Sequence, residues 1–259
     1  SAPAVPPPAA GAHLLSVEFC RRGRHALPAG DYCTIAADGH AAVSMTAAGA
    51  DDYYPGAVYE GLQFWIDPDA QTGSGFLALM GLDVHGIINY FCAGGPYYCP
   101  MGDELATLVD ELWREFDVSG YASPGELRYA VVRLLYMLQL PYADQMAWYP
   151  RAQVDLVRDA ETLMLADLSV RHTARELAVQ FGVSESSFKA YCCDVLGDGY
   201  LPYFRRKRLE KAADLLAHTD LKVQDIAVQV GYESQSKFAK AFADQFRLTP
   251  LEYRRLAGK

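Results

Sequence analysis

Two matched stretches of the sequence could hold polar side chains at the exposed start of a helix. Residues 178–183 (AVQFGV) recur as residues 227–232 (AVQVGY), 49 residues later. Each copy is typical of the end of a short helix, with a small alanine where two helices cross closely. Each also has a glycine at the turn, Gly182 or Gly231, where a positive φ costs little. The chemistry of the repeat depends on the helix that follows each turn.

A new helix is predicted after each of the two turns. Ser184 and Ser234 can cap these helices, and Phe188 and Phe238 give each an apolar anchor four residues past the cap. Each copy is therefore predicted to be a helix-turn-helix. This motif offers its second helix to the major groove of DNA, where base edges carry a readable pattern of donors and acceptors.

A basic stretch lies between the two copies. Residues 203–208 (YFRRKR) open a predicted helix that continues to Leu216. Its cations, Arg205 and Arg206 among them, could touch phosphates while the helix holds the two units together. Two such units at matched spacing favour DNA binding. The alternative is an all-helical protein-interaction module that does not contact DNA.

Charge divides the chain into two parts. The first 150 residues hold 6 Lys/Arg and 17 Asp/Glu, whereas residues 151–259 hold 17 Lys/Arg and 15 Asp/Glu. An acidic front and a mildly basic back predict two domains with different functions. With 51% hydrophobic residues the chain can bury a core. It has neither a run of about 18 apolar residues nor a signal peptide, so we expect a cytoplasmic protein without a membrane partner.

The front part shows strand patterns and then helix patterns. Leu15, Val17 and Phe19 alternate as in a half-buried strand, and residues 59–67 give the best strand, within a region of short strands and turns that extends to about residue 100. Such strands favour a small barrel or sandwich. The apolar positions of two helices follow, at Leu105, Leu108, Val109, Leu112 and Phe116 and then at Leu127, Val131, Leu134, Leu135 and Leu138.

The predicted fold is α+β with two domains. An N-terminal β-barrel is followed by two helices, and the C-terminal domain is all-α with two helix-turn-helix units. The expected segments are a flexible lead (1–12), the barrel domain with its helical hairpin (13–141), a linker (142–158) and the helical domain (159–259).

Residues 159–256 resemble the AraC/XylS family of bacterial transcription regulators. The matching positions fall in both units and in the helix between them: Ala178, Gly182, Ser184, Arg208, Ala212, Leu216, Ile226, Ala227, Gly231, Tyr232, Ser234, Ser236, Phe238, Phe242, Thr249, Pro250, Tyr253 and Arg254. The resemblance implies two recognition helices that enter the major groove about one helical turn apart. It implies double-stranded DNA as a partner, and we expect RNA polymerase and a second copy of the chain as further partners. Activation is the expected mode of regulation, with repression as the alternative.

The resemblance also implies which side chains face the DNA. They are Ser186, Lys189 and Ala190 in the first unit, and Gln235, Ser236, Lys237 and Lys240 in the second. The first unit departs from the family pattern at Ala190, Cys192, Cys193 and Asp194, and Arg247 replaces a common glycine. We therefore expect the first unit to position the protein and the second to read the bases.

The front half looks like the cupin-like sensor domain of the same family. The likeness rests on Gly23 and Arg24, on residues 59–61 (YEG), and on Phe91 and Cys92. In the family this domain binds a small effector or mediates dimerisation. Aromatic rings suit a small organic ligand, so we expect effector binding by Arg24, Tyr54, Tyr59 and Trp65. The alternative places these rings in the core and at a dimer surface.

The sequence argues against an enzyme, a metal and a cofactor. A metal cupin needs an HxH pattern, and the front-half histidines (His13, His25, His40 and His85) form none. We therefore predict no catalytic residues, no metal ligands and no cofactor. The six cysteines form no CxxC pair, and we expect reduced, mostly buried thiols.

These observations predict a DNA-binding transcription regulator that responds to a small organic effector. A linkage mechanism is expected, in which effector binding in the front domain changes DNA affinity. Two alternatives remain, a regulator without an effector whose front domain only dimerises, and a helical protein-interaction module.

Overall fold

The computed structural model of the chain describes residues 13–47, 53–71, 75–119, 123–138 and 147–257. The chain divides into two compact units, Ser1–Ala152 and Gln153–Lys259. The expected lead and residues 142–146 of the expected linker lie outside the described residues. In the remainder of that linker, helix α5 (Arg151–Ala166) already begins at Arg151. None of the helices described is both long and apolar enough to cross a lipid bilayer.

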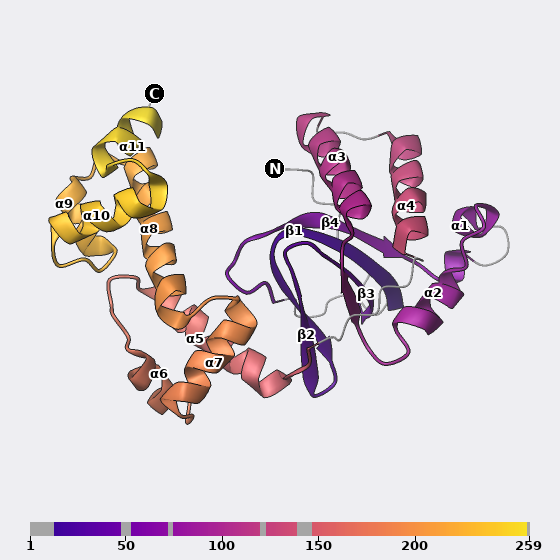
Figure 1. Cartoon of the computed structure of the whole chain (residues 1–259), viewed down its shortest axis with the longest axis horizontal. Coiled ribbons are helices and arrows are strands. Elements are labelled where there is room, and N and C mark those ends of the chain that lie inside the picture. The colour runs from indigo at the N-terminus through magenta and orange to yellow at the C-terminus, as the bar shows by residue number, and fades with distance from the viewer. Residues whose placement is uncertain (1–12, 48–52, 72–74, 120–122, 139–146, 258–259) are drawn as a thin grey trace. The chain divides into compact units, whose positions relative to one another are not determined.

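The first unit is built on a strongly curled antiparallel sheet (Figure 1). Its long strand β1 (His13–Ala29) pairs along its first half with β3 (His40–Ala47) and with β4 (Tyr59–Ile66). Along its second half, β1 pairs with β2 (Tyr32–Ala37). One strand therefore belongs to both parts of the sheet.

Two short strands complete the sheet at its edges. Strand β5 (Tyr97–Pro100) pairs with β3, and β6 (Tyr149–Pro150) pairs with β2. Among the described strands, no pairing joins β4 or β5 to β6. The predicted β-rich front is thus confirmed in the form of a half-barrel.

Strand β1 bends where its pairing with β4 shifts register, between Cys20 and Arg22. Such a bulge increases the local twist of a strand. Gly23 follows with φ +102°, and a Cβ atom there would lie 2.0 Å from the carbonyl oxygen of Val58. Only glycine fits this combination of backbone conformation and close approach, which lets β1 turn from one half of the sheet to the other.

The core of the first unit lies between one face of the sheet and the helices. Leu15, Val17 and Phe19 are fully buried there, as their alternation predicts. The intervening Ser16 and Glu18 belong to the opposite face, because successive side chains of a strand point to opposite sides. Both are also buried, so this strand is covered on both faces and not half-buried as expected.

Two short helices occupy a region that the sequence predicts as strands and turns. They are α1 (Phe76–Leu79) and α2 (Val84–Phe91). Asp83 caps α2 by accepting a hydrogen bond from the backbone N–H of Gly86 at 2.9 Å. Apolar residues at helical spacing bury one side of α2, and this spacing outweighs the local β-propensity of its isoleucines and aromatics.

The two predicted helices of the first unit are confirmed as α3 (Asp103–Ser119) and α4 (Pro124–Leu138). Ser123 and Glu126 form the expected capping arrangement before α4. The buried face of α4 differs from the predicted one, since Leu127 is exposed. Leu134 and Leu135 are buried as predicted, Val131 is partly buried, and Ala130 and Val132 are buried in addition. The side chains of Phe116 and Leu138 lie outside the described residues.

The described part of the second unit is helical throughout. After α5 come α6 (Ala174–Gln180), α7 (Glu185–Leu196), α8 (Tyr200–His218), α9 (Val223–Gln229), α10 (Gln235–Phe246) and α11 (Pro250–Ala257). The all-α prediction for this domain is confirmed. Helix α8 is the longest of these helices and contacts its neighbours on both sides, α7 before it and α9, α10 and α11 after it.

Candidate DNA-binding interface

The first helix-turn-helix consists of α6 and α7. Thr173 and Glu176 form a reciprocal capping box at the start of α6. Ser184 caps α7 by accepting a hydrogen bond from the backbone N–H of Ser187 at 3.0 Å. The turn between the helices contains Gly182 at φ +71°. The predicted anchor, Phe188, is fully buried, so α7 is held by its inner face and exposes its outer one.

The second helix-turn-helix repeats this design with α9 and α10. Ser234 caps α10 by accepting a hydrogen bond from the backbone N–H of Lys237 at 3.4 Å. Phe238 and Phe242 are fully buried and lie 5.6 Å apart between ring centroids. Gly231 forms the turn at φ +76°. The matched positions of the sequence repeat therefore have the same roles in both motifs: a turn glycine, a serine cap and a buried phenylalanine.

A buried arginine of α8 connects this helix to the segment before α6. Arg208 is 6% exposed, donates from Nη2 to the carbonyl oxygen of Val170 at 2.7 Å, and stacks over Phe204. Burial lowers the pKa of its guanidinium from the ordinary value. Nearby, Arg171 donates from Nε to the carbonyl oxygen of Gly231 at 3.1 Å. The segment before α6 is thereby tied both to α8 and to the second turn.

The predicted base-reading residues of α10 share one exposed surface. Gln235, Ser236, Lys237 and Lys240 are all exposed at or near the start of the helix. Neither lysine makes an ion pair with any residue that the structure describes. Positive charge at this helix end is therefore available to an incoming polyanion. A helix N-terminus adds backbone N–H groups and a favourable dipole to that attraction.

The predicted contacts of α7 are exposed but electrostatically different. Ser186, Lys189 and Ala190 all face solvent. Lys189 Nζ lies 2.6 Å from Glu185 Oε1, and this contact lowers the pKa of the Glu185 carboxyl. The only predicted cation on this helix is thus already paired with an acid on the same exposed side. Ser186 Oγ lies 2.9 Å from Ser184 Oγ in the cap.

The predicted basic cluster on α8 is only partly available. Arg205 is exposed and lies 3.6 Å from Asp244 of α10. Arg206 Nη1 lies 2.5 Å from Asp198 Oδ2. These four side chains line a surface groove of about 600 Å³ between α8 and α10. Lys207, by contrast, pairs with Glu210 and is nearly buried, so the six-residue run is not one continuous basic surface.

The predicted effector-binding residues do not form one site. Tyr54 and Tyr59 lie together, with ring centroids 5.0 Å apart. Trp65 sits at the far end of β4, opposite Ser16, whereas Tyr59 is opposite Gly23. Burial lowers the pKa of Arg24, and the ionisable groups that act on its guanidinium are Tyr149, Asp38, Tyr98 and Cys20. Arg24 adjoins His25 in a strand, so their side chains leave on opposite faces.

Two polar residues that the sequence did not single out accompany the tyrosines. His25 Nδ1 lies 2.8 Å from Glu18 Oε2, and each residue is 2% exposed. The His25 ring stacks on Tyr54 at 4.4 Å and meets Tyr59 edge-on at 6.0 Å. Burial and the Glu18 charge raise the pKa of Tyr59. The sequence signal for this polar group was Glu18, an acid within an apolar strand, because a buried acid needs specific partners.

Comparison with known proteins supports the assignment of the second unit. A family model described as a helix-turn-helix domain matches residues 177–256. The transcriptional regulator AlkR of Acinetobacter baylyi is 37% identical over 82 residues, which are 32% of this chain and 27% of that protein. A Streptomyces lividans protein named as an AraC-like transcription regulator is 31% identical over 131 residues, 49% of this chain and 43% of its own length.

One solved structure is similar to part of the chain. The C-terminal domain of AraT, a response regulator from Geobacillus stearothermophilus, is 30% identical with a TM-score of 0.39, covering 40% of this chain and 87% of that one. The chain spans less than half the length of either curated relative. The family model extends from α6 to α11 and so includes both helix-turn-helix motifs and α8 between them. Residues 177–256 therefore match a helix-turn-helix domain, and the chain is similar in sequence to a protein named as an AraC-like transcription regulator.

Proposed function

We propose that this protein is a sequence-specific regulator of transcription that binds double-stranded DNA. One observation carries the proposal: α10 exposes Gln235, Ser236, Lys237 and Lys240 on a helix that buried phenylalanines hold in place. Side chains of these types can reach base edges and phosphates in the major groove. The AraC-type domain and the regulators to which the chain is similar support the same conclusion.

The two recognition helices have unequal roles in this proposal. Helix α10 reads bases, since its lysines are not paired within the described residues. Helix α7, with Ser186, Lys189 and Ala190, positions the protein, since Glu185 already offsets its lysine. Arg205 and Arg206 line the groove between α8 and α10 and contact phosphates by exchanging their carboxylate partners for the DNA backbone. Such exchanges make the affinity depend strongly on salt.

The first unit is proposed to sense a small organic effector and to form a homodimer. The buried polar group of Glu18, His25, Tyr54 and Tyr59 supports an effector site on the inner side of the curled sheet. An effector that binds one conformation better shifts the population toward it and so changes DNA affinity. The protein is proposed to act in the cytoplasm as an activator that contacts RNA polymerase.

A titration of the full chain with labelled DNA tests the regulator proposal. Fluorescence anisotropy would be measured with operators selected from random genomic fragments, in excess competitor DNA and at two salt concentrations. Lys237→Ala and Gln235→Ala are each expected to weaken specific binding by about fivefold or more. Lys211→Ala is the matched control, because Lys211 is an exposed lysine of α8 that pairs with Asp214.

The outcomes separate the alternatives. Loss of affinity in the α10 variants, with binding unchanged in Lys211→Ala, supports base reading by α10. If selection returns no preferred fragment and the variants bind like the parent, the domain is a protein-interaction module. If specific binding occurs and no compound from an effector screen alters it, the first unit serves dimerisation only.

A further inference from the structure

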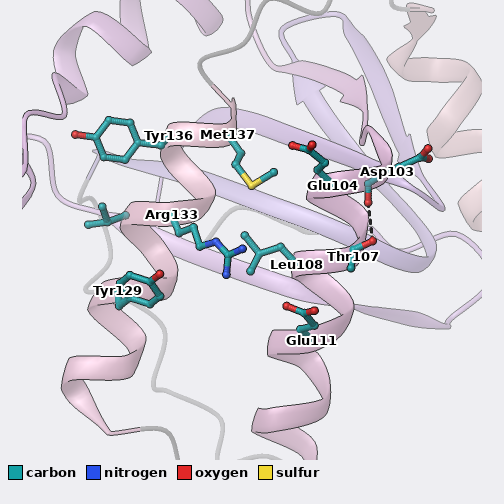
Figure 2. A pocket seen from close by; sticks show the side chains of 10 residues that line it. Asp103, Glu104, Thr107, Leu108, Glu111, Tyr129, Arg133, Tyr136 and Met137 are labelled. Carbon is teal, nitrogen blue, oxygen red and sulfur yellow. Dashed lines mark hydrogen bonds between the residues drawn. The ribbon is translucent and has the colours of Figure 1, made fainter.

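A groove on the first unit separates the outer sides of α3 and α4. It has a volume of about 670 Å³ and ten lining residues (Figure 2): Asp103, Glu104, Thr107, Leu108, Glu111, Tyr129, Val132, Arg133, Tyr136 and Met137. The inner sides of both helices are occupied by the core. The groove is therefore a separate feature from the inner side of the curled sheet, where Tyr54 and Tyr59 lie.

Charge in this groove is unbalanced. Three carboxylates, Asp103, Glu104 and Glu111, come from α3, and the only cation among the lining residues is Arg133 of α4. Figure 2 shows Glu104 and Glu111 directed into the space between the helices, with Arg133 reaching toward them from α4. Arg133 forms no ion pair within the described residues. The groove thus keeps a net negative charge that its own arginine does not remove.

Apolar and aromatic groups complete the lining. Leu108 and Val132 are buried, and Met137 reaches between the helices above Leu108 (Figure 2). Tyr129 is 67% exposed, and Tyr136 is fixed in place because its hydroxyl donates to the carbonyl oxygen of Met80. A groove of this size can hold a small organic molecule. The exposed tyrosine rings can contact both cations and apolar groups.

We propose that the α3–α4 groove binds a small organic cation, an amine with an apolar body. The ammonium would lie near Glu104 and Glu111, and the apolar part would lie along Leu108 and Met137. Because the groove is open to solvent, each charge contact contributes modestly. This site is independent of the DNA interface on the second unit.

Three probes of similar shape test the charge requirement. Binding of 2-phenylethylamine, neutral 2-phenylethanol and anionic 3-phenylpropanoate to the full chain would be followed by ligand-observed NMR titration. The amine is expected to bind saturably with a dissociation constant of about a millimolar. The alcohol and the anion are expected to bind at least about fivefold more weakly. Equal binding of all three probes, or no binding of the amine, would overturn the proposal.

Variants locate the binding in the groove. Glu104→Gln with Glu111→Gln is expected to weaken amine binding about fivefold or more, and Arg133→Gln to strengthen it about twofold or more. Glu233→Gln, the same change at an exposed residue of the second unit, is the matched control. Unchanged thermal unfolding and DNA binding would show that the double variant is folded. A double variant that binds the amine like the parent contradicts the proposal.

A second copy of the chain is the competing occupant. Sedimentation velocity over a range of protein concentrations, with and without the amine, distinguishes it. Amine binding that does not depend on protein concentration supports a ligand groove. Amine binding that appears only when the protein is diluted to monomers identifies the groove as a contact between copies and overturns the proposal. Neither result bears on whether α10 reads DNA.

Discussion

Lys189 and Glu185 lie one turn apart on α7 with their charged atoms 2.6 Å apart, whereas Lys237 and Lys240 of α10 form no ion pair within the described residues. Both recognition helices are exposed, so the difference is electrostatic and not one of access. A DNA phosphate that approaches α7 must compete for Lys189 with the carboxylate of Glu185, which the same helix keeps next to the lysine. Helix α7 therefore attracts DNA phosphates less strongly than α10 does.

Removing the acid from α7 should strengthen DNA binding. Glu185→Gln leaves Lys189 unpaired and removes one like charge facing the DNA. Affinity for the selected operator is expected to rise about two- to fivefold, and the salt dependence to steepen by up to about one counterion. Asp214→Asn is the control, since it releases Lys211 on α8 by the same chemical change. If both variants bind DNA alike, the Lys189–Glu185 pair does not limit α7.

Arg208 should matter for stability more than for DNA contact. Arg208→Met keeps the apolar stem but removes the hydrogen bond to Val170 and the charge over Phe204. A charge-assisted hydrogen bond of this kind contributes about 1.5–3 kcal/mol. The free energy of unfolding of the helical domain, followed by circular dichroism in urea, is expected to fall by about that amount. Arg205→Met, at an exposed position, is expected to change it by less than about 0.5 kcal/mol.

The two turn glycines should respond differently to alanine. Gly182 and Gly231 share a positive φ, so alanine at either position costs about 1–2 kcal/mol. A Cβ atom on Gly182 meets nothing within 4 Å, whereas one on Gly231 would lie 2.9 Å from the carbonyl oxygens of Leu168 and Ser169. Urea unfolding is expected to show a clearly larger loss for Gly231→Ala. Equal losses would mean that the loop before α6 moves aside without cost.

Much of the helical domain could be predicted because its signals are local. Caps such as Ser184 and Ser234, and anchors four residues later, act within one helix, and the sequence shows them directly. The buried role of Arg208 could not be read in this way. In sequence it belongs to a basic run, and only the meeting of α8 with the loop before α6 gives it Val170 as a partner.

The first unit was harder to predict because its key contacts are distant in sequence. The bend at Gly23 decides which side chains of β1 meet those of β4. Trp65 and Tyr59 therefore lie at opposite ends of β4, although each residue type suits a ligand. Glu18 and His25 meet only because β1 curls, and no spacing rule predicts a pair seven residues apart in a bent strand. Long-range pairing of this kind is invisible to hydrophobic periodicity.

The adjacent cysteines at the end of α7 should differ in reactivity. Cys193 is exposed, whereas Cys192 is fully buried, and burial raises the pKa of its thiol from 9.0 to about 12. The thiolate is the nucleophile, so iodoacetamide at pH 8 is expected to alkylate Cys193 and to leave Cys192 unmodified until urea is added. Peptide mass spectrometry distinguishes the two, and fast modification of Cys192 in the folded protein would contradict its burial.

The same thiol predicts how stability depends on pH. Because the pKa of Cys192 is higher in the folded chain than in the unfolded one, folding favours the protonated thiol. Its contribution is complete below pH 9 and is lost as the pH rises from about 9 toward 12. Between pH 8 and pH 10.5, Cys192→Ala should therefore lose less stability than the parent, although its stability at pH 8 is lower because alanine leaves a small cavity. Cys193→Ala serves as the control, and urea unfolding at the two pH values measures the difference. Identical pH slopes for the parent and Cys192→Ala would show that this thiol is not protected by folding.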